Sequence, residues 1–367
     1  MILPEKAPVQ SNKPSTKSNK PSTAKCKLPM YISFLLSEPK LANCQRLSEV
    51  SEASHDSVNR FLAREEYTPF DLFNEVKNLI VLGGGTLSVD DTVLDKPYIT
   101  VFKADLAGWF WSGKHKKSVK GFNLITLYYT DPLGSQVPVN YRIYDKKENK
   151  TKNEYFREML DEVIAWGLNP AWITGDSWYS SLANMTGIKN HAHNFMFAIE
   201  KNRLISVSGE EEFYQIQSFD VPEEGLKAYL KGFGEVMIFR TVFKNEYRYY
   251  IMFSLNKETE ELLPLTKADF VRIHDQHWNI ERYHRAIKQE CNIERFQVRK
   301  ERQIRTHIFC ALAAFVQLEF MRSEKRMKNW YELRRNLFNE VIANFIQEGI
   351  APDGIPFGAD ITSSVNA

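Results

Sequence analysis

The spacing of hydrophobic residues divides the chain into parts with different predicted secondary structure. Residues 30–82 and residues from about 266 to 349 show the spacing of amphipathic helices. Between them lie apolar runs and alternating patterns typical of β-strands, some separated by segments with helical spacing. The pattern therefore predicts a helical beginning, a middle that mixes strands and helices, and a helical end.

The first helical part is expected to contain two short helices. Ser54, or Ser51 before it, is predicted to cap the first helix, and Thr68 precedes the second. The inward-facing residues are expected to be Val58, Phe61 and Leu62 in the first helix and Phe70, Phe73, Val76 and Leu79 in the second. Such a pair suits a helix-turn-helix-like DNA-binding module, which we assign to residues 29–85, although most helix pairs bind no DNA.

The middle of the chain has a pattern that fits a mixed sheet. A first strand is expected at Thr86–Asp90, directly after three glycines. Further strands are predicted at residues 119–130, 137–144, 171–174 and 195–199, and helices at 152–166 and 180–187. Three strands followed by alternating helix and strand predict a mixed sheet flanked by helices. Residues 203–265 again have the pattern of strands and are interpreted as a β-rich insertion.

Positive charge is concentrated in two regions, although the net charge of the 367 residues is only +2. Residues 282–328 contain twelve Lys and Arg against five acidic residues. Clustered basic charge indicates a polyanionic partner, but a basic helix is about as often merely exposed to solvent. Residues 1–28, which carry a repeated SNKPST sequence, are expected to form a disordered basic tail that either contacts phosphates or has no role.

Several classes of protein are disfavoured by the sequence. No stretch approaches the ~20 apolar residues of a membrane span, and no apolar segment of a secretory signal is found at the N-terminus. The four cysteines form no CxxC pair, which predicts free thiols in a reducing compartment. His191 and His193 lack further ligands at the spacing of a zinc site.

Three acidic residues form the candidate catalytic site. Asp90 and Asp176 each stand at the end of a predicted strand, where reactive groups collect in open α/β sheets. Glu281 lies on a predicted helix over residues 274–290. Three carboxylates can hold two Mg²⁺ ions about 3.5–4 Å apart, which activate a water or a 3′-hydroxyl for phosphoryl displacement.

One face of the helix that carries Glu281 has a stripe of polar residues. They follow at intervals of three or four positions and comprise His274, His277, Glu281, His284 or Arg285, and Lys288. Taken alone, such a stripe is more typical of a solvated helix face with paired charges. Beside a metal-binding triad, Lys288 would instead hold a DNA phosphate. Trp178 and Trp278, near the second and third acids, are expected to pack in the core, with stacking on a displaced base as the alternative.

Together these motifs resemble those of DDE insertion-sequence transposases, whose catalytic core has an RNase H-like fold. Glu281 and Lys288 match the E-(6)-K half of a Y-(2)-R-(3)-E-(6)-K helix signature, and Trp278 and Ile280 match the residues before the Glu. His274 and His277 stand where that signature has Tyr and Arg.

The strand motifs of this family are also present. Asp90, Thr92 and Leu94 match the first-acid motif Asp-x-Thr-x-Leu, and residues 173–179 (ITGDSWY) match the second-acid strand. Asp91 follows Asp90 directly, so the first acid is either of the two. The Asp-x-Thr register favours Asp90, and only one of two successive strand residues can face the site.

The resemblance implies a fold and a division into domains. The fold is expected to be α/β, an RNase H-like mixed sheet flanked by helices, with the β-rich insertion and the N-terminal helical DNA-binding module added to it. The catalytic core would occupy residues 86–202 and 266–325, and a C-terminal helical region would follow at 326–367.

The resemblance also implies a function. The protein would be a DNA transposase that uses two Mg²⁺ ions, or Mn²⁺, to cleave transposon ends, after which the 3′-hydroxyl attacks another phosphodiester bond. Its partners would be double-stranded DNA, as terminal inverted repeats and target, and a second copy of the chain in a synaptic homodimer. A cytoplasmic, nucleoid-associated location is expected. Candidate DNA-contacting residues are Lys288, His277, His274, Arg285, Lys114, Lys116, Lys117 and Arg299, together with Arg295 and Arg302.

Two other functions are compatible with the sequence. One is a catalytically inactive, transposase-derived protein that only binds DNA. The other is an RNase H-like nuclease that cleaves nucleic acid without strand transfer. The three acids and Lys288 argue against the first alternative, and the N-terminal module and the β-rich insertion argue against the second.

Overall fold

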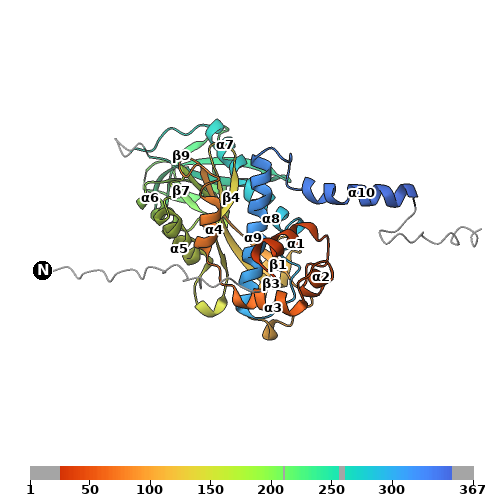
Figure 1. The fold of residues 1–367 in the computed structure, drawn as a ribbon. Coiled ribbons are helices and arrows are strands. Elements are labelled where there is room, and N and C mark those ends of the chain that lie inside the picture. The colour runs from red at the N-terminus through yellow and green to blue at the C-terminus, as the bar shows by residue number, and fades with distance from the viewer. Residues whose placement is uncertain (1–24, 210, 256–260, 349–367) are drawn as a thin grey trace, which may run out of the picture.

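A large mixed sheet forms the centre of the computed structural model, which describes residues 25–209, 211–255 and 261–348. Its neighbouring strands follow the order β2-β3-β1-β5-β6-β11-β10-β9-β7-β8, and β4 pairs with β3. Figure 1 shows α9 passing through the middle of the molecule, with the N-terminal helices beside it and α10 projecting away from the body. The mixed sheet flanked by helices that the sequence predicts is therefore confirmed.

The first half of the sheet contains the strands that carry two of the candidate acids. The strands are β1 (Thr86–Asp95), β2 (Gly108–Ser112), β3 (Lys117–Thr130), β4 (Gln136–Ile143), β5 (Trp172–Gly175) and β6 (Asn194–Ile199). Strands β1, β5 and β6 are parallel, and β3 is antiparallel to β1 and β4. Helix α5 (Lys152–Ala165) precedes β5, and α6 (Leu182–Asn190) connects β5 to β6. The predicted strands agree with these bounds to within a few residues, except that β1 is longer and β2 was not expected.

The β-rich segment extends the central sheet. Its strands are β7 (Leu204–Ser206), β8 (Tyr214–Gln215), β9 (Leu226–Leu230), β10 (Gly234–Phe243) and β11 (Glu246–Phe253). Lys244 and Asn245 both have positive φ angles, as a tight two-residue hairpin turn between β10 and β11 requires. Strand β11 then pairs antiparallel with β6, so the edge of β6 is covered by the chain itself.

Four helices precede the sheet. They are α1 (Leu28–Ser37), α2 (Cys44–Glu49), α3 (His55–Arg64) and α4 (Pro69–Val76). Ser54 caps α3 by accepting the Ser57 N–H, and Thr68 forms a capping box with Asp71 at the start of α4. The Ser54 cap is confirmed, and the second helix follows Thr68 as expected. Two of the predicted inward residues differ: Phe70 is 40% exposed, and Leu79 lies beyond the end of α4.

The expected disordered tail ends earlier than residue 28. Residues 1–24 lie outside the described part of the chain. Cys26 is fully buried, its N–H donates a hydrogen bond to Ser57 Oγ, and α1 begins at Leu28. The sequence pattern missed these residues because their burial depends on α3, which lies about thirty positions further along the chain.

The helices after the sheet complete the fold. They are α7 (Lys267–His277), α8 (Asn279–Gln289), α9 (Glu301–Ser323) and α10 (Glu332–Glu348). The helix predicted through residues 274–290 is interrupted at Trp278, which separates α7 from α8. By length and composition α9 could cross a membrane, contrary to the sequence-based expectation, but it is largely buried inside the protein as a core helix is.

The two faces of the sheet are covered by different helices. Asp91 on β1 contacts Lys152 of α5, whereas Asp90 contacts His284 of α8. Because successive strand residues point to opposite faces, α5 and α8 must cover opposite faces of the sheet. Tyr128 of β3 stacks on Tyr283 of α8 and also contacts Phe315 of α9, which places α8 and α9 on the same face.

Candidate active site

Pairing of β1 with β5 brings the first two acids together. The two parallel strands are in register at Val89 and Gly175, and Asp90 and Asp176 are the next residues on each. A side chain could not replace the hydrogen of Gly175, since a Cβ there would lie 2.9 Å from Val89 Cγ1 and 2.8 Å from Phe197. The glycine before the second acid therefore permits the close packing of strands that places the acids side by side.

Asp91 has a complete set of partners on the other face of the sheet. Its carboxylate accepts hydrogen bonds from Asn123 Nδ2 at 2.6 Å, Lys152 Nζ at 2.7 Å and the Tyr179 hydroxyl at 3.2 Å. These contacts tie β1 to β3, to α5 and to the short helix after β5. The arrangement favours Asp90 as the first acid of the candidate site.

Helix α8 places two side chains beside Asp90. Ligand atoms of Asp90, Glu281 and His284 all lie within 4.8 Å of one another, and His284 Nδ1 is 3.5 Å from Asp90 Oδ2. Glu281 and His284 are three residues apart on the helix and so share one face of it. The sequence analysis had considered His284 only as part of the polar stripe, and its spacing from Glu281 was the signal that could have identified it.

Asp176 is close to this group but outside the set of three. Its carboxylate caps the short helix Ser177–Tyr179 by accepting the Trp178 N–H at 2.9 Å. The residue is exposed at the surface of the protein. Loss of hydration around the carboxyl group and the negative charges of Asp90 and Asp91 nevertheless raise the pKa of Asp176 to about 7.

The charges at this site are poorly neutralised by the protein. Burial, followed by the charges of Asp91 and Glu281, raises the pKa of Asp90 well above its usual range. Burial lowers the pKa of His284 to about 4, so its imidazole is neutral at neutral pH. Crowded carboxylates beside a neutral imidazole form an oxygen-rich donor set, which suits a bound divalent cation.

The two histidines at the end of α7 face the sheet. His277 Nδ1 is 3.0 Å from Thr174 Oγ1, and Thr174 is bonded in turn to Ser88. His274 Nε2 is 3.3 Å from the Tyr250 hydroxyl. Burial lowers the pKa of both, that of His277 to about 4. These neutral rings dock α7 on the sheet, which does not favour the phosphate contacts predicted for them.

Lys288 is also engaged within the protein. Its Nζ donates a hydrogen bond to the Val93 carbonyl at 2.6 Å and lies 3.2 Å from Glu294 Oε1. The side chain therefore links α8 to β1 and to the segment before α9, with a quarter of its surface exposed. Arg285, on the turn between Glu281 and Lys288, is exposed. In this conformation Arg285 is better placed than Lys288 to meet a DNA phosphate.

The remaining basic candidates lie on other elements than the acids. Lys114, Lys116 and Lys117 are exposed at the turn between β2 and β3. On β2 the exposed residues alternate with buried ones and include Trp109 and Trp111. The hairpin thus presents aromatic rings and positive charge together.

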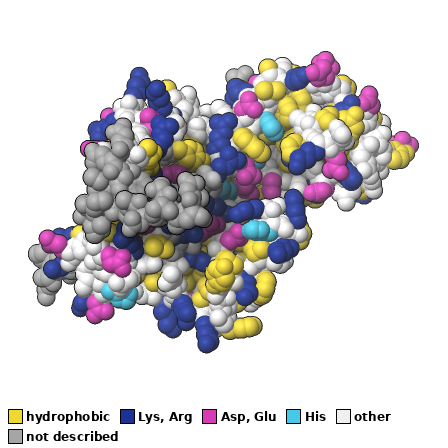
Figure 2. Space-filling model, turned by 90° about the vertical axis from the view of Figure 1, so that its right-hand side faces the viewer, with side chains coloured by type: hydrophobic (Ala, Val, Ile, Leu, Met, Phe, Trp, Pro, Cys, Tyr) yellow, Lys and Arg dark blue, Asp and Glu magenta, His cyan; other side chains and the backbone are white. Residues whose placement is uncertain are grey.

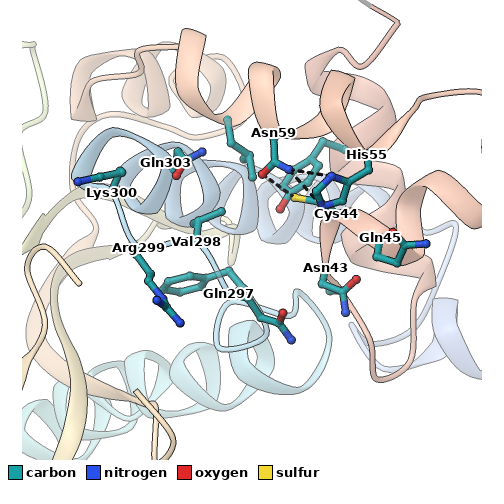
Figure 3. A pocket seen from close by; sticks show the side chains of 14 residues that line it. Asn43, Cys44, Gln45, His55, Asn59, Gln297, Val298, Arg299, Lys300 and Gln303 are labelled. Atoms are coloured by element: carbon teal, nitrogen blue, oxygen red, sulfur yellow. Dashed lines mark hydrogen bonds between the residues drawn. The ribbon is translucent and has the colours of Figure 1, made fainter. Parts of the chain in front are cut away.

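Arg299 lines a pocket of about 440 Å³ between the N-terminal helices and the segment before α9. Figure 3 shows Arg299 and Gln297 on one side of this pocket and Asn43, His55 and Asn59 on the other. Arg295 is exposed, and Arg302 forms an ion pair with Glu66 at 3.0 Å.

The two tryptophans beside the acids do not pack in the core as expected. Trp178 is 63% exposed and Trp278 is 48% exposed. Next to Asp176, a second pocket of about 610 Å³ extends over β6 and β11 and includes Lys201, Arg248 and Tyr247. Figure 2 shows a hollow between two lobes of the molecule, in which acidic and histidine side chains lie near Lys and Arg.

Comparison with known proteins identifies a family and a similar fold. A family model described as "Transposase DDE domain" matches residues 83–316. A cryo-EM structure of the piggyBac transposase synaptic complex with hairpin DNA has a similar fold, with a TM-score of 0.50 and 12% sequence identity over 88% of this chain and 71% of that chain. At that identity the likeness concerns the fold alone, which is the RNase H-like transposase fold. No curated protein matches the sequence.

Proposed function

The chain belongs to the DDE transposase family, and from this membership we propose that it cleaves DNA at transposon ends and transfers the cleaved strand to target DNA. The observation that carries the proposal is the placing of Glu281 within reach of Asp90, with Asp176 following the residue that pairs beside Asp90 on the neighbouring strand. The same residues would hold two divalent ions, Mg²⁺ or Mn²⁺. Bound there, the ions would activate the attacking hydroxyl and stabilise the leaving oxygen.

The residues of the chain support this chemistry in distinct ways. Asp90 follows Val89, the residue that pairs with Gly175 just before Asp176, and its carboxylate lies within 4.8 Å of the ligand atoms of Glu281 and His284. Lys288 and Glu294 fix α8 against β1, which keeps Glu281 at the sheet. The reacting strand would therefore meet a site whose carboxylates are held by regular structure, as precise catalysis requires.

DNA is the substrate that the surface near the acids fits. The exposed Trp178 and Trp278 offer rings on which a displaced base could stack. Exposed Arg285 offers a contact to a phosphate near the acids, and the lysines at the β2–β3 turn would hold DNA further away. The helices before the sheet, with the pocket beside Arg299, would recognise the transposon end. We also expect a synaptic homodimer and a nucleoid-associated, cytoplasmic location.

The test is cleavage and strand transfer on DNA that carries the element's own terminal repeats. Glu281→Gln is expected to reduce metal-dependent nicking about a thousandfold, equal to about 4 kcal/mol, with DNA binding retained. Asp275→Asn is the matched control, because Asp275 is an exposed acid on the neighbouring helix α7. It is expected to leave both steps unchanged.

Two outcomes would replace the proposal by another function. DNA binding without cleavage by the unmodified protein would identify a DNA-binding relative that has lost catalysis. Cleavage that depends on Glu281 but yields no joined product would identify a nuclease without strand transfer. Loss of activity in the Asp275→Asn control would show that charge on this surface, and not the triad, governs the reaction.

A further inference from the structure

His284 has an unusual environment for a buried histidine. Only 5% of the residue is exposed, and its Nε2 is buried with no hydrogen-bond partner among the residues that the structure describes. A buried polar atom without a partner costs about 1–3 kcal/mol. Because such a cost is normally avoided, the hydrogen bonding of this imidazole is incomplete in the protein alone.

The other ring nitrogen faces the acids. Nδ1 lies 3.5 Å from Asp90 Oδ2, while the second oxygen of Asp90 accepts the Asp91 N–H at 2.7 Å. One Asp90 oxygen is therefore committed to the backbone, and the other is directed toward His284. At 3.5 Å this pair is longer than a good N–H···O hydrogen bond, which measures about 2.7–3.2 Å.

The spacing of the three groups suits a shared ion. Two ligand atoms bound at about 2.1 Å to the same ion are up to about 4.2 Å apart. The ligand atoms of Asp90, Glu281 and His284 lie within 4.8 Å of one another, so a small side-chain adjustment would bring them to that distance. Glu281 is exposed and on the same helix as His284, so it can make this adjustment.

We propose that His284 is a direct nitrogen ligand of the metal ion held by Asp90 and Glu281, and that it makes this site prefer Mn²⁺ to Mg²⁺. The inference rests on the proposed function. Both Mg²⁺ and Mn²⁺ bind carboxylates well, but Mg²⁺ favours oxygen ligands alone, whereas the transition-metal ion Mn²⁺ also accepts an imidazole beside carboxylates. A site with two carboxylates and one imidazole therefore binds Mn²⁺ more tightly than Mg²⁺, whereas a site with carboxylates alone binds the two ions with similar affinity.

The direct test is electron paramagnetic resonance of MnCl₂ bound to the full-length protein. A coordinated imidazole gives the bound Mn²⁺ a ¹⁴N hyperfine coupling, which changes to the ¹⁵N pattern when the protein contains ¹⁵N-labelled histidine. The matched control is His277→Gln, because His277 is a half-buried histidine on the adjacent helix that bonds to Thr174. The coupling is expected to persist in this variant and to disappear in His284→Gln.

A second measurement uses the preference between ions. In His284→Asp the ratio of Mn²⁺ to Mg²⁺ affinity, measured by titration calorimetry, is expected to fall about tenfold or more. The labelled unmodified protein needs no substitution, so the test stands even if a variant does not fold.

The possible results separate this inference from the proposed function. Mn²⁺ binding that requires Glu281 but shows no nitrogen coupling would overturn the role of His284 and leave the triad intact. An unchanged ratio of Mn²⁺ to Mg²⁺ affinity in His284→Asp would also overturn the role of His284 and leave the triad intact. Failure of the unmodified protein to bind either ion would overturn both proposals.

Discussion

Asp90 and Asp91 are neighbours in β1, yet their side chains have very different hydrogen-bond partners on the two faces of the sheet. Asp91 receives three hydrogen bonds, one of them from the cation of Lys152. Asp90 receives the backbone N–H of Asp91 and otherwise faces Glu281 and His284, and its pKa is raised by burial and by neighbouring acids. The protein balances the charge of the Asp91 carboxylate on one face of the sheet, and it does not balance the charge of the Asp90 carboxylate on the other.

Two buried histidines show the same contrast. His307 is fully buried, with Nδ1 2.8 Å from the Tyr31 hydroxyl and Nε2 3.3 Å from the Asn292 carbonyl. His284 is almost as buried, but its Nε2 has no partner in the described part of the chain. Satisfied polar groups hold a fold together, and unsatisfied ones that cluster indicate where a ligand is expected. Substitutions at Asp90, Asp91 and His307 test this distinction.

The largest effect is expected for Asp90→Asn. Removing one of several crowded carboxylates should reduce the rate of metal-dependent DNA cleavage about a thousandfold or more. The free energy of unfolding should stay the same or rise, because the folded state disfavours this charge. Urea denaturation and a nicking assay on the same preparation measure both. A clear loss of stability would mean that Asp90 is structural, as Asp91 is.

Asp91→Asn should lower the stability of the protein and leave metal binding intact, the opposite of the result expected for Asp90→Asn. The substitution leaves Lys152, whose side chain is 21% exposed, without its carboxylate partner. We expect the free energy of unfolding to fall by about 2–3 kcal/mol, somewhat less than for a fully buried ion pair. At a temperature where the variant is folded, metal binding should persist. If Asp91→Asn abolished metal binding without loss of stability, the assignment of the two acids would be reversed.

The third prediction concerns pH and His307. Burial, and then the charge of Lys96, lower the pKa of this histidine from 6.5 to about 3, and Tyr31 is the other titratable group that faces it. The unfolded state therefore binds a proton that the folded state does not, between pH 6.5 and about 3. Stability contributed in this way is full above pH 6.5 and is lost as the pH falls, with a slope of up to about 1.4 kcal/mol per pH unit.

The check is His307→Gln followed by urea denaturation at several pH values. The variant should be less stable than the unmodified protein at pH 7, and the difference should narrow as the solution is acidified toward pH 3. Parallel stability curves for the two proteins would show that another group controls the acid sensitivity.

The smallest effect is expected at the β2–β3 turn. Replacing Lys114, Lys116 and Lys117 by Gln should reduce the slope of log Kd for DNA against log salt by at most about 2–3, with cleavage chemistry intact. A matched control replaces three exposed lysines elsewhere, Lys40, Lys77 and Lys189. Equal changes in both variants would indicate a general effect of charge and no specific contact by the turn.

Local signals in the sequence predicted most of the secondary structure. Ser54 and Thr68 act as helix caps through hydrogen bonds that span only three residues, so their residue types suffice to identify them. The strand predicted at 119–130 corresponds to β3 because its β-branched and aromatic residues favour a strand wherever it pairs. Signals of this kind need no knowledge of the rest of the chain.

Features that depend on distant contacts were missed or misjudged. The expected continuous helix over 274–290 is broken at Trp278, where α7 docks on the sheet through His277 and α8 through Lys288. Both Trp178 and Trp278 have hydrophobic side chains, and composition alone favoured the core for them. Trp178 follows β5 and Trp278 follows α7, so the pairing of β5 in the sheet and the docking of α7 on it determine whether the rings are exposed.

The sequence by itself determined which acids could form the site, because their motifs and the strand and helix that carry each are local properties. The alternation of strand residues also established that only one of Asp90 and Asp91 could face the other acids. Only the tertiary structure decided that Asp90 is the one beside Glu281, that His284 lies in the same group, and that Lys288 is bound to β1. The reason is physical: the packing of α8 and α5 on opposite faces of β1 joins residues that are far apart in the chain, and no local pattern encodes that choice.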